Sequence, residues 1–87
     1  MKTRIVVLKS EDGLHARPAA ILVKKAGEFK SKIDVEYQGT SKSAKSVMGL
    51  MSLGLPQGAE LTLIADGDDA DAALETLANL VENNFAI

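Results

Sequence analysis

Cysteine and tryptophan are absent from this sequence, and only 3% of its residues are aromatic. Without cysteine the chain forms no disulfide and offers no thiolate to a zinc ion, which suits a reducing compartment. Aliphatic side chains and methionine must therefore fill the core. The hydrophobic content of 46% is ordinary for a globular protein, so the composition still predicts a packed interior.

Long apolar runs and an excess of positive charge are also missing. No stretch approaches the ~20 apolar residues of a membrane span, and charged residues from Lys9 onward come too early for a signal peptide. The net charge of −2 disfavours nucleic-acid binding, which needs clustered Lys and Arg. We expect a cytoplasmic monomer that contacts neither membrane nor nucleic acid, and 87 residues predict a single domain over 1–87.

The hydrophobic pattern predicts four short strands and three helices. The expected strands cover residues 3–9, 33–37, 40–44 and 61–65. The expected helices cover 16–29, a two-turn segment from 47 to 54, and a final segment from the aspartates at 68–71 through Phe85. The order β-α-β-β-α-β-α predicts an α+β fold in which a four-stranded antiparallel sheet carries the helices on one face. The strand at 40–44 is almost wholly polar and is expected at an edge.

The single histidine, His15, lies where the first strand gives way to the first helix. The first turn of a helix presents unpaired N–H groups and the positive end of the helix dipole, which together favour an anion. A neutral imidazole there is a nucleophile, and the nearby Arg17 offers bidentate donors to phosphate. The alternative is an exposed or capping histidine without chemistry. One histidine and no cysteine predict no metal site, and nothing in the sequence calls for a cofactor.

Ser46 precedes the two-turn helix and is a favoured N-cap residue. It is either a plain cap or a phosphorylation site, because a phosphate is tolerated at a helix start beside Lys45. The helix carries more apolar surface than two turns can bury. We expect Leu50 and Leu53 to face the core, and Val47, Met48 and Met51 to form an exposed patch.

Two segments carry a family resemblance: Gly13-Leu14-His15-Ala16-Arg17-Pro18-Ala19, and the run from Lys45-Ser46-Val47-Met48 to Leu53-Gly54. Together they resemble HPr, the histidine phosphocarrier family of the bacterial sugar phosphotransferase system, along the whole chain. The resemblance implies an open-faced β-sandwich. It also implies that His15 takes a phosphoryl group on Nδ1 from enzyme I and passes it to the IIA domains of sugar permeases, with Arg17 steadying the phosphate.

Further partners follow from the same resemblance. A serine kinase acting on Ser46, as in many Gram-positive members, and a catabolite-control transcription factor are implied, and Lys24 and Lys45 match basic residues that flank the site in some members. With the exposed patch, Leu14 and Ala16, these lysines make up the expected partner-binding surface. The family often has Ser or Asn before the site glycine, whereas this chain has Asp12. That carboxylate would either repel the phosphoryl group or cap the turn.

Two other functions compete with the phosphocarrier. One is a purely regulatory protein that acts through phosphorylated Ser46, against which the presence of His15 argues. The other is a small ligand-binding domain of ferredoxin-like topology in which His15 is unreactive. The segment around Ser46 disfavours the nitrogen-regulatory branch of the phosphotransferase system.

Overall fold

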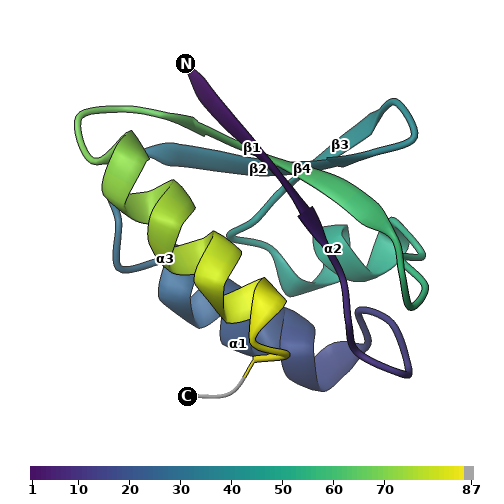
Figure 1. Ribbon diagram of the computed structural model, residues 1–87. Coiled ribbons are helices and arrows are strands. Elements are labelled where there is room, and N and C mark those ends of the chain that lie inside the picture. Colours follow the sequence, from purple (N-terminus) through teal and green to yellow (C-terminus); the bar gives the residue numbers. More distant parts are fainter. Residues whose placement is uncertain (86–87) are drawn as a thin grey trace.

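The computed structural model describes residues 1–85 and confirms the predicted α+β architecture. Three helices cover one face of a four-stranded antiparallel sheet, and the other face is open (Figure 1). The strand order is β1-β4-β2-β3. The elements are β1 (Lys2–Val7), α1 (Ala16–Ala26), β2 (Lys32–Tyr37), β3 (Thr40–Ser43), α2 (Val47–Ser52), β4 (Glu60–Asp66) and α3 (Ala70–Glu82).

The core lies between the sheet and the helices. Alternate residues of β2 and β4 point towards the helices, as the two-residue period of a strand requires, and Ile33 and Leu63 are fully buried. Each helix adds an aliphatic side chain to the same cluster: Leu22 from α1, Leu50 from α2 and Leu77 from α3. The strand β3 is exposed along its whole length and forms an edge, as its polar sequence predicts.

Two helix ends differ from the prediction. The first helix ends at Ala26 rather than near Phe29, because the chain turns at Gly27 and leaves Phe29 half-buried in the following loop. The last helix ends at Glu82. Phe85 lies beyond it, yet stays buried because a Schellman turn folds the chain back. In that turn Asn84 adopts a φ of 55°, and the Phe85 N–H donates to the Leu80 carbonyl at 2.7 Å.

Asp69 joins two loops that are distant in the sequence. It occupies the N-cap position of α3, but its side chain makes no capping bond. The carboxylate instead accepts hydrogen bonds from the Lys30 N–H at 2.8 Å, the Ser31 N–H at 3.0 Å and the Ser31 hydroxyl. The hydroxyl bond first, and then the Lys30 N–H bond, hold the pKa of Asp69 below its ordinary value. The start of α3 is thereby fixed to the turn between α1 and β2.

Candidate functional site

His15 is the N-cap residue of α1. Its backbone is extended, with φ of −85° and ψ of −171°, and its carbonyl accepts the Ala19 N–H at 3.0 Å. The imidazole makes no capping bond and is exposed. The N–H groups of Ala16 and Arg17 begin the helix, where no carbonyl lies one turn back to receive them. An exposed imidazole therefore stands at the positive end of a helix.

The loop before His15 packs against the backbone of Leu55, in the segment that follows α2. Gly13 has a φ of +72°, and a Cβ built on it would lie 2.2 Å from the Leu55 carbonyl oxygen. The Leu14 N–H donates to that same oxygen at 2.9 Å. Only glycine fits so close an approach with a positive φ. The segment after α2 thus fixes the backbone that leads into His15.

One expected contact residue is corrected by this packing. Leu14 is only 6% exposed, because its side chain joins the core cluster while its backbone bonds to Leu55. A side chain so buried offers little area to a partner, so Leu14 is not part of the exposed surface. Ala16, by contrast, is exposed at the first position of α1.

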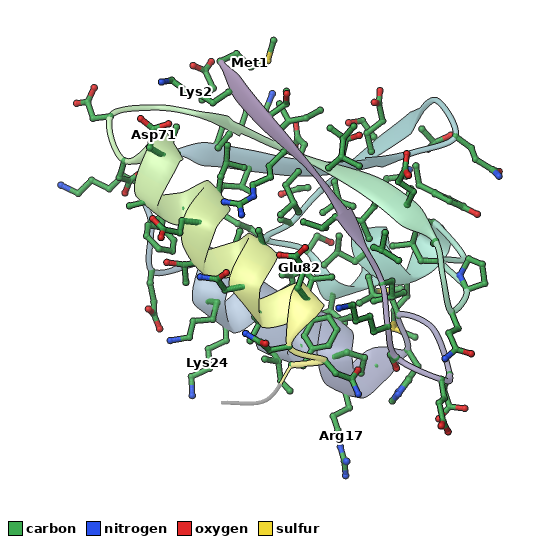
Figure 2. The ribbon with its side chains drawn as sticks, viewed as in Figure 1. Met1, Lys2, Arg17, Lys24, Asp71 and Glu82 are labelled. Atoms are coloured by element: carbon green, nitrogen blue, oxygen red, sulfur yellow. The ribbon has the colours of Figure 1, made fainter. Side chains whose placement is uncertain are left out.

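His15 and Arg17 line one hollow of about 430 Å³ at the start of α1. Arg17 extends from the helix away from the body of the molecule (Figure 2). The lining residues come from three parts of the chain: Ser10, Asp12, His15, Arg17, Pro18, Ile21, Asn84 and Phe85. The structure therefore brings the two predicted phosphate-handling residues together and adds the turn after α3, which the sequence analysis did not assign to the site.

Asn84 and Phe85 were missed for a physical reason. The only local signal was an asparagine able to adopt the left-handed conformation that ends a helix. Asn84 and Phe85 lie near His15 because α3 packs against α1. The apolar periodicity of a helix does not predict which end of a neighbouring helix it will lie against.

Ser46 caps α2 as predicted. Its backbone is extended, and its hydroxyl oxygen accepts the Gly49 N–H at 3.1 Å. Leu50 is fully buried and Leu53 packs against the core from a half-buried position, so the predicted inner face is confirmed. On the outer face Met48 is 82% and Met51 44% exposed. Val47 is half-buried against the core, so it contributes only the rim of the apolar patch.

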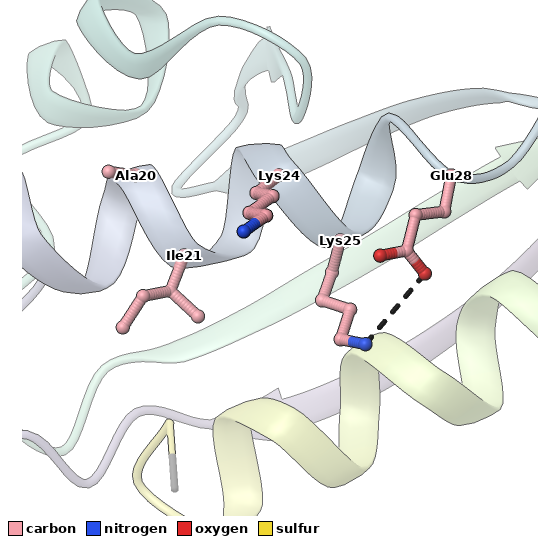
Figure 3. Close-up of a pocket in the computed structure, with 5 residues that line it drawn as sticks. All are labelled: Ala20, Ile21, Lys24, Lys25 and Glu28. Carbon is pink, nitrogen blue, oxygen red and sulfur yellow. Dashed lines mark ion pairs between the residues drawn. The ribbon is translucent and has the colours of Figure 1, made fainter. Parts of the chain in front are cut away.

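The two lysines expected at the partner surface have different surroundings. Lys45 is exposed, and its ammonium donates to the Phe29 carbonyl at 2.9 Å, which ties the start of α2 to the loop after α1. Lys24 lines a second hollow of about 390 Å³ on α1, together with Ala20, Ile21, Lys25 and Glu28 (Figure 3). There Lys25 pairs with Glu28 at 3.7 Å, while no ion pair within residues 1–85 engages Lys24.

Residues 1–85 contain no cluster of three or more His, Cys, Asp or Glu side chains that could hold a metal ion. None of the helices α1 to α3 has the length and hydropathy needed to cross a bilayer.

Known proteins resemble this chain over nearly its full length. A family model described as "PTS HPr component phosphorylation site" matches residues 2–83. The structure of HPr-C-His from Thermoanaerobacter tengcongensis is 46% identical, with a TM-score of 0.94, and the match covers 98% of this chain and 96% of that one. The phosphocarrier protein HPr from Bacillus anthracis is 41% identical at a TM-score of 0.88, covering 92% and 95%.

A third similar structure is Crh, a catabolite repression protein of Bacillus subtilis described as an intertwined, swapped dimer. It is 44% identical to this chain, with a TM-score of 0.79 and complete coverage of both chains.

Proposed function

This chain belongs to the HPr phosphocarrier family of the phosphotransferase system, and on that premise we propose that His15 carries a phosphoryl group from enzyme I to the IIA domains of sugar permeases. The observation that carries the proposal is the position of His15. His15 is the N-cap residue of α1, and its exposed imidazole shares a hollow with Arg17. The proposal is supported by the family model that matches residues 2–83, which is described as a phosphorylation site.

The chemistry uses the neutral imidazole. Its Nδ1 lone pair attacks the phosphorus of phosphorylated enzyme I, a nitrogen–phosphorus bond forms on His15, and the bond to the donor's imidazole breaks. The donor ring leaves with the electron pair of that bond. Donation to a IIA domain repeats the exchange with His15 as the leaving group. Each step trades one nitrogen–phosphorus bond for another.

Two kinds of donor stabilise the transferred group. The N–H groups of the first turn of α1 point along the helix axis towards its start, and the helix dipole adds a partial positive charge. Arg17 lines the same hollow and offers a planar pair of N–H donors that matches phosphate. Fixed donors of this kind favour developing charge without reorganisation.

The partner surface is proposed around the start of α1 and the outer face of α2. Met48 and Met51 supply its apolar centre, Val47 its rim, and Ala16, Lys24 and Lys45 its surroundings. Leu14 is left out because it is buried. Enzyme I and the IIA domains both have to reach His15, so they meet this surface in turn, and flexible methionines suit a surface that accepts several partners.

A second role is proposed for Ser46. Its hydroxyl stands at the start of α2 beside the exposed Met48, so a phosphate there would place about two negative charges against the apolar patch. A regulatory serine kinase and phosphorylase, and a catabolite-control transcription factor that reads the phosphoserine, are the partners this role requires. The exposed His15 favours a carrier with added regulation over a purely regulatory protein.

The carrier is proposed to work as a cytoplasmic monomer and as one domain over residues 1–87, without a cofactor. The test mixes the protein with phosphoenolpyruvate, enzyme I and a IIA domain and follows phosphorylation of the IIA domain over time. Phosphorylated IIA should accumulate only when this chain is added. If IIA is phosphorylated equally well without it, or not at all with it, the protein is not the carrier between the two.

A further inference from the structure

A carboxylate shares the hollow of the reactive histidine. Asp12 lines the same space of about 430 Å³ as His15 and Arg17. A phosphoryl group on His15 that faces this space meets a guanidinium, which attracts it, and a carboxylate, which repels it. The proposed site therefore contains one charge that favours the phosphorylated state and one that opposes it.

The Asp12 carboxylate is not used to hold the turn together. The turn closes through the backbone, where the Gly13 N–H donates to the Ser10 carbonyl at 3.0 Å. No side-chain hydrogen bond or ion pair in the part of the chain that the structure describes involves Asp12, and the residue is exposed. A role as a turn cap thus has no support in the contacts, which leaves the electrostatic role.

The backbone that follows Asp12 is fixed, so it cannot easily shift to carry the Asp12 carboxylate away from His15. Gly13 is packed against the Leu55 carbonyl, and Leu14 is hydrogen-bonded to the same oxygen. His15 is fixed in turn as the N-cap of α1. The carboxylate and the imidazole are thus attached to one rigid segment, so the phosphoryl group meets the field of Asp12 each time His15 is loaded.

We propose that Asp12 destabilises phosphorylated His15 relative to the free imidazole, and so makes this chain a stronger phosphoryl donor than it would be with a neutral residue there. The inference rests on the proposed function for its biological meaning. When His15 donates, the acceptor nitrogen attacks phosphorus, the nitrogen–phosphorus bond to His15 breaks, and the electron pair returns to the ring. The phosphoryl charges leave with the group, so donation relieves the repulsion that loading creates.

The test uses chemical phosphorylation, so it does not depend on enzyme I. Potassium phosphoramidate transfers its phosphoryl group to imidazole and releases ammonia, and His15 is the only histidine in the chain. Isotope-labelled wild-type protein and Asp12→Asn are mixed, brought to equilibrium with phosphoramidate and excess ammonium, and compared by intact-protein mass spectrometry. The matched control is Glu11→Gln, which removes an exposed carboxylate next to Asp12 that does not line the hollow.

We expect the ratio of phosphorylated to free His15 to be roughly threefold to tenfold higher in Asp12→Asn than in the wild type, because the substitution removes the repulsion of one nearby unit charge. Glu11→Gln should stay within about twofold, and the difference should shrink at 1 M salt, where charges are screened within about 3 Å. If Asp12→Asn and Glu11→Gln show the same ratio of phosphorylated to free His15, the inference is wrong. An Asp12→Asn variant that changes only the thermal midpoint would also overturn it, because that result would mean a structural role.

A parallel incubation of the same proteins with enzyme I and phosphoenolpyruvate separates this inference from the proposed function. Wild-type protein that is phosphorylated by phosphoramidate but never by enzyme I would refute the carrier role and leave the effect of Asp12 standing. If the wild-type protein accepts phosphate from enzyme I but Asp12→Asn holds no more phosphate than the wild type, the carrier role stands and the effect of Asp12 is refuted.

Discussion

Gly13 turns the chain into the His15 loop with a φ of +72°, and its α-carbon lies against the carbonyl of Leu55. A β-carbon at this residue meets two separate penalties. The first is the left-handed backbone conformation that side chains disfavour. The second is an overlap with a carbonyl that also receives the Leu14 N–H and therefore cannot move freely.

The first prediction compares two glycines to separate these penalties. Gly54 has nearly the same φ, +65°, but open space around it. Gly54→Ala should cost about 1 kcal/mol from the backbone conformation alone. Gly13→Ala should cost about 3 kcal/mol or more, because forced overlap adds 1–3 kcal/mol. Urea unfolding measures both, and equal losses would show that the contact with Leu55 is not tight.

At the scale of single elements, α2 is the helix whose signals are most local. Serine as N-cap predicts its start at Val47, and the structure begins it there. Such reasoning predicts the ends of α1 and α3 less well, because Phe29 and Phe85 continue the apolar spacing and pack against the core outside the helices, Phe29 half-buried and Phe85 buried. The apolar spacing correctly predicts that Phe29 and Phe85 pack against the core. It places them inside the helices, because spacing alone does not distinguish a turn from one more turn of helix.

The second prediction concerns the cap of α2. Ser46→Asp should accept phosphate from enzyme I several-fold more slowly, because a carboxylate beside Met48 must be desolvated or must meet acidic groups when the partner docks. Its thermal midpoint should stay nearly unchanged, since aspartate is as good an N-cap as serine.

The control for charge is Ser46→Asn, which also caps the helix but remains neutral. Kinetics of transfer from enzyme I, measured over a range of carrier concentrations, should show weaker binding for Ser46→Asp alone. If the aspartate and asparagine variants accept phosphate equally fast, negative charge at the start of α2 does not regulate docking.

The third prediction concerns the contact between the start of α3 and the turn before β2. Asp69→Asn removes an anionic acceptor from Lys30 and Ser31, and should lower the thermal midpoint at pH 7 by roughly 5 °C, on the scale of weakened hydrogen bonds in a small domain. Asp68→Asn is the control, because Asp68 is exposed next in sequence and makes none of these bonds.

The loss should depend on pH. The folded state lowers the pKa of Asp69, so the carboxylate contributes stability that is fully present above its unfolded pKa and is lost as the pH falls through the lower, folded pKa. The difference in midpoint between wild type and Asp69→Asn should therefore narrow below about pH 4. A difference that stays constant down to pH 2 would mean that the charge of Asp69 does not matter.

On the scale of the whole molecule, the three helices lie on one side and the uncovered face of the sheet lies on the other (Figure 1). The resemblance to HPr and the apolar surplus of α2 predict a partner surface that includes Met48 and Met51, and both side chains are exposed in the structure. The sequence predicted Asp12 near His15, but it did not predict that Asn84 and Phe85 line the same hollow, because these two residues reach it only when α1 and α3 pack together. Contacts between such distant segments carry no local signal.

The fourth prediction tests whether partners bind the helix side of the molecule rather than the sheet side. Met48→Glu should weaken binding of both enzyme I and a IIA domain by roughly tenfold, since the new charge is desolvated in an apolar contact. Ile5→Glu places the same change on β1, where Ile5 is 61% exposed, and should leave both affinities unchanged. Calorimetric titration measures the four affinities. Equal effects of the two substitutions would remove Met48 from the partner surface.

The most direct measurement asks where the phosphoryl group sits. Wild-type protein is incubated with phosphoenolpyruvate and enzyme I, digested under alkaline conditions that preserve phosphohistidine, and mapped by mass spectrometry, with His15→Ala treated in parallel. One phosphoryl group should appear on the peptide that contains His15, and the folded His15→Ala variant should gain none. A phosphoryl group on any other residue, or undiminished labelling of His15→Ala, would contradict the account.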